Sequence, residues 1–291
     1  MAGHLTFELV SQADGTKLAG RSWLPPEPPR AIVQISHGLA EHCLRYDRFA
    51  ASLLAAGIGA YAHDHRGHGH SLLGEGDYGN AGPEGWPALT RDLVQVTDHI
   101  RAEHSETPLF VFGHSMGSFA AQKALLDRSD VLAGVILSGS TDIPTVLELV
   151  AATGEAPSFE AYNAAFEPAR TAFDWLSRDE AEVDAYVNDA ACGWDAPDDF
   201  LGSMMMHAGE GTAPESLAKV RADLPLLFLA GDADPLNGEL SLLHILMDRY
   251  RQAGLSDIDS QFYKHGRHEM LNEINRDEVT AALLAWISQR L

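Results

Sequence analysis

Short apolar runs alternate with helix-length patterns along the chain, and this alternation limits the possible folds more than any other feature. The run AIVQIS at residues 31–36 is continuous and rich in β-forming side chains, which is typical of a strand buried on both faces of a sheet. Further strands are predicted at residues 58–64, 108–113, 132–138, 224–231 and 257–263, and helices at residues 45–56, 86–104, 115–126, 238–253 and 276–290. This order predicts an α/β protein whose mostly parallel sheet carries helices on both faces.

The N-terminal residues depart from this alternation. Two strand-like runs at residues 5–10 and 17–23 stand on either side of Asp14-Gly15. This dipeptide favours a tight hairpin turn, so we expect the two runs to pair as antiparallel strands.

A second departure is the long acidic segment at residues 141–219, which contains no convincing strand. Many aspartates and glutamates occur there, and its basic side chains are Arg170, Arg178 and Lys219. We interpret it as a helical insertion above the sheet, which divides the chain into core segments at residues 1–140 and 220–291 and an insertion between them.

Charge and cysteine content limit the partners and the compartment. The formal net charge of −22 repels phosphate backbones, so no nucleic-acid partner is expected, and it disfavours anionic membrane surfaces. The two cysteines, Cys43 and Cys192, are too few for a disulfide framework or a cysteine zinc site and are interpreted as free thiols. No signal peptide or membrane-spanning run is evident, so we predict a cytoplasmic protein without stable membrane insertion.

The pentapeptide GHSMG at residues 113–117 carries the strongest chemical signal. It fits the pattern G-x-S-x-G and lies between a predicted strand and a predicted helix, where Ser115 would occupy a strained turn with its Oγ exposed above the sheet. The flanking glycines leave room where side chains would collide, and the helix N-terminus directs its free N–H groups at the same point. Ser115 is therefore the candidate nucleophile.

A serine nucleophile needs a histidine base and an orienting carboxylate, which on this scaffold follow in the order Ser, acid, His. Asp232 and Asp234 follow a late predicted strand, and His265 and His268 follow the last one. We prefer Asp234 because it lies further into its loop, with Asp232 as the alternative acid or as a residue that holds the turn. His268, which is followed by a helix, is preferred as the base over His265, which we interpret as an exposed loop histidine.

Acyl transfer also requires hydrogen-bond donors for the oxyanion. One candidate is the backbone N–H of Met116, directly after the nucleophile. The other is the N–H of Leu39, in the loop after an early central strand, where His37-Gly38 allows a sharp turn.

The stretch HDHRGHGHS at residues 63–71 suggests a metal site because it holds four histidines. In a strand its first two histidines alternate with Asp64, and the glycine turn carries the other two elsewhere, so the four do not converge. The serine mechanism also needs no metal. We therefore expect no metal or cofactor and assign the stretch to structural support, with Asp64 and Arg66 anchoring neighbouring backbone.

Together these segments resemble the α/β-hydrolase fold, in particular the monoacylglycerol lipase and lysophospholipase-like serine hydrolases, which are related to proteins described as serine aminopeptidases. The resemblance is carried, in the family's order and over nearly the whole chain, by HGLAEHCLRYDRFAASLLAAG, HDHRGHGHS, FGHSMGS, SRDEAEVDAYVNDAACG, FLAGDADPLN and GRHEMLNE. It implies Ser115, Asp234 and His268 as the triad, and Leu39 and Met116 as the oxyanion donors. The acidic insertion would be the family's cap, which lines the acyl-chain entrance.

This chain departs from the family's pattern at two places. Gly117-Ser118 stands where the family often has two glycines, and Asp189-Ala190 stands where the cap has Asp-Pro. The first change keeps a small side chain, so packing of the helix against the strand should survive. The second affects the cap and bears on substrate choice.

The predicted reaction is hydrolysis of a small-molecule acyl ester through an acyl-enzyme, with monoacylglycerol or lysophospholipid as the expected substrate. The run SMMMHAG at residues 203–209 could line an acyl groove, because methionine adapts to flexible chains, or it could be ordinary cap packing. A small-ester carboxylesterase is one alternative. Another is a serine aminopeptidase, for which the acidic insertion could supply the amine pocket. A non-catalytic ligand-binding relative is disfavoured because all three triad members are present.

Overall fold

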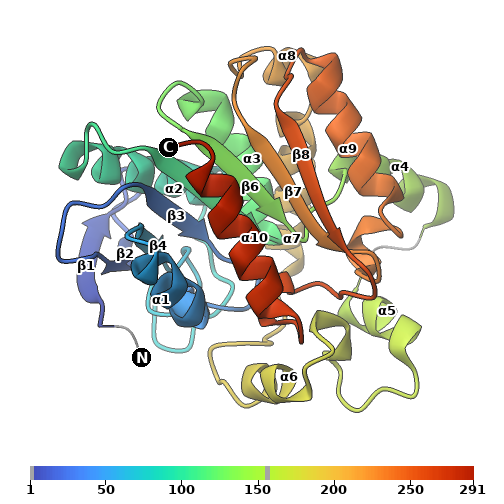
Figure 1. Cartoon of the computed structure of the whole chain (residues 1–291). Coiled ribbons are helices and arrows are strands. Elements are labelled where there is room, and N and C mark those ends of the chain that lie inside the picture. The colour runs from blue at the N-terminus through green and yellow to red at the C-terminus, as the bar shows by residue number, and fades with distance from the viewer. Residues whose placement is uncertain (1–2, 155–157) are drawn as a thin grey trace.

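The computed structural model describes residues 3–154 and 158–291, and it is built on an eight-stranded sheet (Figure 1). The strands lie side by side in the order β1-β2-β4-β3-β5-β6-β7-β8. Their bounds are Leu5–Val10 for β1, Lys17–Trp23 for β2, Ile32–Ser36 for β3, Gly59–His63 for β4, Leu109–His114 for β5, Gly134–Ser138 for β6, Leu226–Gly231 for β7 and Ile258–Tyr263 for β8. All neighbours from β4 to β8 are parallel, so the predicted mostly parallel α/β sheet is confirmed.

The antiparallel part of the sheet is the predicted N-terminal hairpin. β2 pairs antiparallel with β1 on one side and with β4 on the other. Gly15 has φ 84°, a left-handed conformation that glycine adopts without steric cost, and it turns the chain between the two strands.

Helices cover both faces of the sheet. Their bounds are Asp47–Ala55 for α1, Gly85–Glu103 for α2, Met116–Arg128 for α3, Ser241–Gln252 for α9 and Arg276–Ser288 for α10. α1 and α10 lie on one face, and α2, α3 and α9 lie on the other (Figure 1).

Side chains along the central strands alternate between these two helical layers. In β5, Phe110 and Phe112 pack with α1 and α10, whereas Leu109 and Val111 pack with α2, α3 and α9. Each buried side chain of this size contributes about 1.5–3 kcal/mol of transfer free energy. Burial on both faces explains why the strands appear in the sequence as continuous apolar runs.

Two helices begin later than predicted, because another turn precedes each of them. A 3₁₀ turn at Cys43–Tyr46 comes before α1, and another at Pro235–Asn237 comes before α9. Gly238 then has φ 58°, which an α-helix does not accommodate, so α9 starts only at Ser241.

The acidic segment contains no strand among its described residues, 141–154 and 158–219, and residues 155–157 lie outside the described residues. Its helices are α4 at Ile143–Thr153, α5 at Phe159–Asn163, α6 at Glu180–Val187, α7 at Asp198–Gly211 and α8 at Pro214–Leu217. Buried side chains of α7 pack with those of α2 and α3, whereas α5 and α6 lie at the edge where the parallel strands end (Figure 1). The segment is therefore split between a helical layer and the rim of the sheet.

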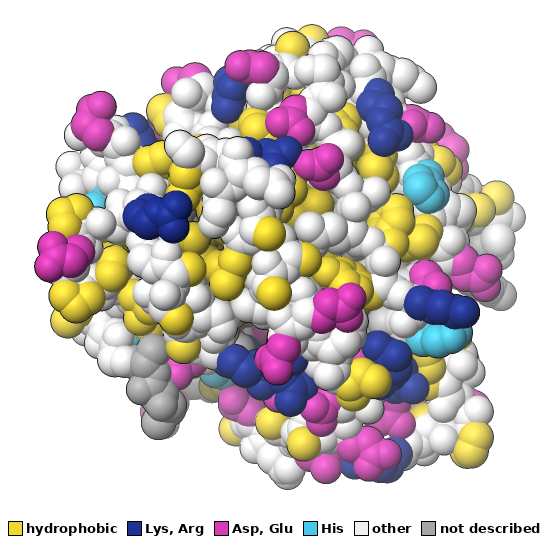
Figure 2. All heavy atoms as spheres, viewed as in Figure 1, with side chains coloured by type: hydrophobic (Ala, Val, Ile, Leu, Met, Phe, Trp, Pro, Cys, Tyr) yellow, Lys and Arg dark blue, Asp and Glu magenta, His cyan; other side chains and the backbone are white. Residues whose placement is uncertain are grey.

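Acidic side chains of this segment form ion pairs with arginines of the core. Glu182 of α6 lies 2.5 Å from Arg48, and Asp179, just before α6, lies 2.6 Å from Arg276. Figure 2 shows acidic and basic side chains gathered at this lower end of the molecule. Exposed pairs of this kind contribute at most about 1 kcal/mol each, so their main effect is to orient the segment on the core.

Within the described residues, no helix combines the length and the apolar character that a membrane span requires.

Candidate active site

Ser115 lies on a strained turn between β5 and α3. Its φ of 51° and ψ of −122° fall outside the regions that L-residues ordinarily adopt, at a cost of about 1–3 kcal/mol. The backbone N–H of Ser115 donates to the Ser138 carbonyl at 2.9 Å, which ties the turn to β6. Ser115 itself is only half-buried, and helix α3 begins at the next residue. This is the geometry expected of a nucleophile at a strand-to-helix turn.

The residues around Ser115 are small because neighbouring backbone lies very close. A Cβ at Gly117 would stand 2.1 Å from the Ser36 carbonyl oxygen, and a Cβ at Gly113 would stand 2.5 Å from the Gly117 carbonyl oxygen. Both positions therefore require glycine. Ser118 is tolerated where the family often has a second glycine, and its hydroxyl donates to the Ser115 carbonyl at 2.7 Å.

Asp234 and His268 form a buried hydrogen-bonded pair at the same edge of the sheet. His268 Nδ1 lies 2.9 Å from Asp234 Oδ2, and Leu236 N donates to the other carboxylate oxygen at 2.9 Å. Burial lowers the pKa of His268, but the charge of Asp234 and the hydrogen bond to it outweigh burial, so the pKa is raised above 6.5. A histidine held in this way can accept a proton from a serine hydroxyl.

The alternative acid and base serve a neighbouring turn. The N–H of His265 donates to the Asp232 carboxylate, and His265 is exposed with φ 60°. Between the two candidate acids, the structure pairs Asp234 with a histidine and assigns Asp232 to the turn.

His268 lies beside His114, the residue before Ser115, around Gly139, which follows β6. Gly139 has φ 56°, and a Cβ there would stand 2.8 Å from His268 Cε1 and 3.0 Å from His114 Cε1. The ring centroids of His114 and His268 are 4.7 Å apart, and Ser115 follows His114 directly. In the described part of the chain, Ser115 Oγ makes no hydrogen bond to His268. Such bonds are often long in ligand-free enzymes and shorten when substrate binds.

The loop after β3 brings Leu39 close to the nucleophile. A Cβ at Gly38, the residue before Leu39, would stand 3.3 Å from Ser115 Cβ, and Gly38 N donates to the Glu41 carboxylate. Neither the Leu39 N–H nor the Met116 N–H has an acceptor within residues 3–154 and 158–291. Both of the expected oxyanion donors are therefore free to bind a ligand oxygen.

A buried ion-pair network joins this loop to the residue after His268. Arg45 Nη1 lies 2.6 Å from both Glu41 and Glu269, and Arg45 Nη2 lies 2.8 Å from Glu269. Burial favours protonation of Glu41, but Arg45 outweighs it and lowers the pKa of Glu41 to about 2. Sequence reasoning used Glu41 and Arg45 only as part of a family pattern, and the i,i+4 spacing of the pair was the one local signal for this contact.

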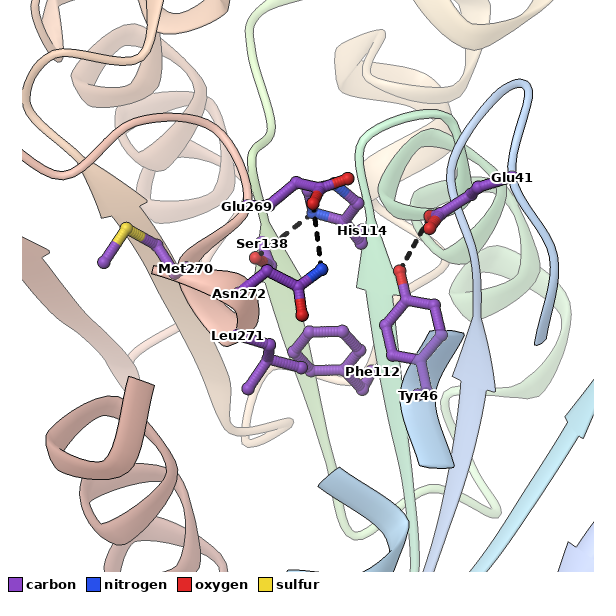
Figure 3. Close-up of a pocket in the computed structure, with 9 residues that line it drawn as sticks. All are labelled: Glu41, Tyr46, Phe112, His114, Ser138, Glu269, Met270, Leu271 and Asn272. Atoms are coloured by element: carbon purple, nitrogen blue, oxygen red, sulfur yellow. Dashed lines mark hydrogen bonds between the residues drawn. The ribbon is translucent and has the colours of Figure 1, made fainter. Parts of the chain in front are cut away.

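A small cavity with a mixed polar and apolar lining lies beside this network (Figure 3). Its lining includes Glu41, which accepts a hydrogen bond from Tyr46, and Glu269, which accepts one from Asn272. The ring of His114 also faces the cavity, and burial together with repulsion from His268 lowers its pKa to about 4. His114 is therefore neutral at physiological pH, whereas the pKa of His268 is raised.

Trp175 of the acidic segment packs directly on the candidate base. Its ring centroid lies 4.8 Å from that of His268, and the backbone N–H of His268 donates to the Trp175 carbonyl at 3.4 Å. Glu269 N likewise donates to the Leu176 carbonyl at 2.8 Å. No sequence signal identified this contact, because residues 174–176 form only a short 3₁₀ turn.

An apolar cluster surrounds the candidate oxyanion donors. The side chains of Leu39 and Met116 pack with Phe119 and with Met204 and Met205 of α7. Met204 is buried and Met205 is partly buried, whereas the side chain of Met206 is exposed. The methionine run is therefore core packing in part, and it also forms an apolar wall beside the donors.

The stretch at residues 63–71 anchors backbone, as predicted. The Asp64 carboxylate accepts hydrogen bonds from Cys43 N and His70 N, each at 2.9 Å. Arg66 is fully buried and donates to the Ala81 carbonyl at 3.0 Å.

Three of the four histidines of this stretch lie together, with ring centroids 4.7 Å apart for His63 and His65 and 6.4 Å apart for His65 and His68, so the expectation that the glycine turn carries His68 elsewhere is wrong. His63, His65 and His68 are buried, but the His70 side chain is 65% exposed. Among the described residues, the one group with the spacing of metal ligands is formed by His42, Asp189 and Cys192, away from this stretch.

Comparison with known proteins agrees with this geometry. The sequence model of the family described as serine aminopeptidase, S33, matches residues 27–275. The monoglyceride lipase of Mus musculus is 30% identical over 96% of this chain and 89% of its own length. A monoacylglycerol lipase of Mycolicibacterium smegmatis is 29% identical over 95% of both chains.

Among solved structures, a thermostable carboxyl esterase from Bacillus coagulans in complex with glycerol superimposes with a TM-score of 0.86. It shares 25% identity with this chain and covers 99% of both chains. The predicted α/β-hydrolase fold is confirmed by this similarity and by the strand order.

Proposed function

Because this chain belongs to the serine aminopeptidase S33 family of α/β hydrolases, we propose that it hydrolyses monoacylglycerol-type esters through an acyl-enzyme on Ser115. At the level of reaction class it is a carboxylic-ester hydrolase, like its lipase and esterase relatives. The observation that carries the mechanism is the buried Asp234–His268 pair, whose histidine ring lies against the turn that bears Ser115.

In the first half-reaction, His268 removes the proton of Ser115 Oγ while the oxygen attacks the ester carbonyl carbon. The oxyanion accepts hydrogen bonds from the N–H groups of Leu39 and Met116, which have no acceptor in the described structure. The ester C–O bond then breaks, and His268 gives the proton to the leaving alcohol oxygen. Asp234 stabilises the imidazolium throughout, which agrees with the raised pKa of His268.

In the second half-reaction, water takes the place of the alcohol. His268 removes a proton from the water, which attacks the acyl carbon and forms a second oxyanion in the same position. Collapse of this intermediate releases the fatty acid and returns the proton to Ser115. No other group is needed for the atoms to balance.

Two features support a lipid ester as substrate. The apolar wall formed by Leu39, Met116 and Met205 lies beside the oxyanion donors, where an acyl chain would leave the carbonyl group. The named lipase relatives match nearly the whole chain. We accordingly assign residues 141–219 as the cap and residues 1–140 and 220–291 as the hydrolase core.

Substitution of the nucleophile tests the mechanism. Ser115→Ala should lower hydrolysis of a p-nitrophenyl acyl ester by about 10⁶-fold and abolish labelling by a fluorophosphonate probe, with thermal unfolding unchanged. Ser118→Ala, which removes a neighbouring hydroxyl but not the nucleophile, is the matched control and should retain labelling. Substantial activity in folded Ser115→Ala would contradict the assignment.

A chain-length series tests the substrate. Monoacylglycerols of increasing acyl length should give a steep rise in kcat/KM, whereas activity confined to acetate and butyrate esters would favour the carboxylesterase alternative, which the Bacillus coagulans similarity supports. Lysophospholipids and a chromogenic aminoacyl amide complete the panel. An aminopeptidase is disfavoured because the buried carboxylates of Glu41 and Glu269, which could otherwise bind an amine, are already paired with Arg45.

A further inference from the structure

Three metal-binding side chains come together where the cap meets the loop after β3. The ligand atoms of His42, Asp189 and Cys192 all lie within 4.8 Å of one another, and His42 Nε2 is 2.9 Å from Asp189 Oδ2. His42 belongs to the core, and the other two belong to the cap. We propose that these residues bind a divalent, thiol-accepting metal ion such as Zn²⁺, which fastens the cap to the loop that carries Leu39.

The distances suit a zinc site after a small adjustment. With bonds of about 2.0–2.3 Å to nitrogen, oxygen and sulfur, neighbouring ligands of tetrahedral zinc stand roughly 3.3–3.7 Å apart. The gap between His42 and Asp189 must therefore open by a few tenths of an ångström, and the sulfur of Cys192 must move inward. Ala191 N donates to Asp189 Oδ1 at 2.9 Å, which holds the other oxygen toward His42.

Exposure leaves room for a fourth ligand. The side chain of Asp189 is 38% exposed and that of His42 is 12% exposed, so solvent reaches the edge of the group and can supply a water molecule. Cys192 is partly buried, and among the described residues its sulfur makes no hydrogen bond, although its backbone N–H donates to the Asp189 carbonyl at 2.9 Å. Three protein ligands and a water complete a tetrahedron.

The surrounding charge favours a cation. The charges of Arg45, Glu41 and Glu269 all act on Cys192, and the two carboxylates outweigh the guanidinium by one negative charge. Asp189 adds another, so a Zn²⁺ ion would neutralise a negative cluster. Cys192 is protonated in the metal-free protein, and binding exchanges its S–H bond for an S–Zn bond with release of one proton to solvent.

The location gives the ion a mechanical role. Gly193 N donates to the Ala40 carbonyl at 3.0 Å, and Tyr186 OH donates to the same carbonyl at 2.9 Å. Ala40 follows Leu39, so the cap already contacts the oxyanion loop at this point. An ion held by His42 and Cys192 would add a metal–ligand link in parallel with these two hydrogen bonds. The ion is a clamp and takes no part in ester hydrolysis.

Cobalt binding to the full-length protein tests the site. After treatment with a chelator, Co²⁺ should bind at one ion per chain with a thiolate-to-cobalt charge-transfer absorption, and Zn²⁺ should displace it. Cys192→Ser should remove that absorption and weaken Zn²⁺ binding by about 100-fold, and His42→Gln and Asp189→Asn should each weaken it at least about tenfold. Zn²⁺ should raise the Tm of the wild type but not that of Cys192→Ser.

Matched variants distinguish this site from adventitious binding. Cys43→Ala removes the other thiol, and Asp195→Asn removes an exposed cap carboxylate close to Cys192 in sequence; both should bind Zn²⁺ as the wild type does. Absence of one-to-one binding, a thiolate band that survives Cys192→Ser, or loss of the band in folded Cys43→Ala would overturn the proposal. Repeating the titration on Ser115→Ala separates this result from the proposed hydrolase activity.

Discussion

Buried histidines of this protein have pKa values that are shifted in opposite directions. Burial lowers the pKa of His63 and of His68 to about 3, although both lie in the motif that is richest in histidine. His268 is equally buried, but the charge of Asp234 and its hydrogen bond raise the pKa of His268 above 6.5. Burial alone makes a histidine inert, and one buried carboxylate partner turns it into a base.

The largest expected effect is a difference in kcat between a variant of His268 and a variant of His63. His268→Ala should lower kcat by about 10⁶-fold, because it removes the proposed base. His63→Phe should leave kcat within about threefold of the wild type, since both ring nitrogens of His63 lack a partner in the described structure. Ester hydrolysis and fluorophosphonate labelling of both purified variants measure the difference. A comparable loss in folded His63→Phe would remove the distinction.

Removal of the Asp234 carboxylate should lower the pKa of His268 toward the low pKa values of His63 and His68. Asp234→Asn keeps the shape of the side chain but loses its charge, so kcat should fall by about 10⁴-fold. The remaining activity requires neutral His268. Because burial then dominates the pKa, the acid limb of kcat/KM, which lies above pH 6.5 in the wild type, should move to lower pH. An acid limb at the same pH in wild type and variant would show that Asp234 does not control the base.

The Arg45 network is expected to have a smaller effect on the base, through position rather than charge. Arg45→Met should lower the free energy of unfolding by about 3–5 kcal/mol, because it leaves the buried carboxylates of Glu41 and Glu269 without a positively charged partner. It should also lower kcat by about 10–100-fold with little change in KM, since Glu269 adjoins His268.

Two further variants separate position from stability in this network. Arg45→Lys should recover part of the kcat, and the triple variant with Glu41→Gln and Glu269→Gln should recover stability but not kcat. If kcat followed stability in every variant, the network would be structural support alone.

The smallest expected effect is on acid stability. A histidine whose folded pKa is depressed stays neutral in the native state, while its unfolded form takes up a proton below about pH 6.5. Stability is therefore lost as pH falls from 6.5 toward 3, by about 1.4 kcal/mol per pH unit for each such histidine. Urea unfolding at several pH values should show a shallower decline in His63→Phe than in the wild type. Identical slopes would mean that His63 is protonated in the folded protein.

The sequence predicted the sheet from local patterns, and local patterns are also the basis of the predicted triad order. Continuous apolar runs identify strands buried on two faces, and Ser115 is marked by a glycine pattern between a strand and a helix. The preference for Asp234 over Asp232 also agrees with the observed hydrogen bonds.

Contacts between distant segments could not be predicted in this way. Arg45 reaches Glu269 across 224 positions of sequence, and the segment of Trp175 has no periodic apolar pattern that would place it on His268. The structural role of the histidine-rich stretch also depends on side-chain geometry. Composition alone does not tell which imidazoles have a hydrogen-bond partner and which have none.

The hydrogen bonds between residues 175–176 and residues 268–269 have a consequence for how such proteins can be recombined. Exchange of the whole segment 141–219 with that of a relative would also exchange the surface against which the proposed base, His268, packs. A chimera that keeps residues 173–178 with its own C-terminal half should stay active, whereas one cut at the ends of the segment should need compensating changes near His268. In terms of inheritance, this short stretch belongs with His268, the proposed base, rather than with the helices around it.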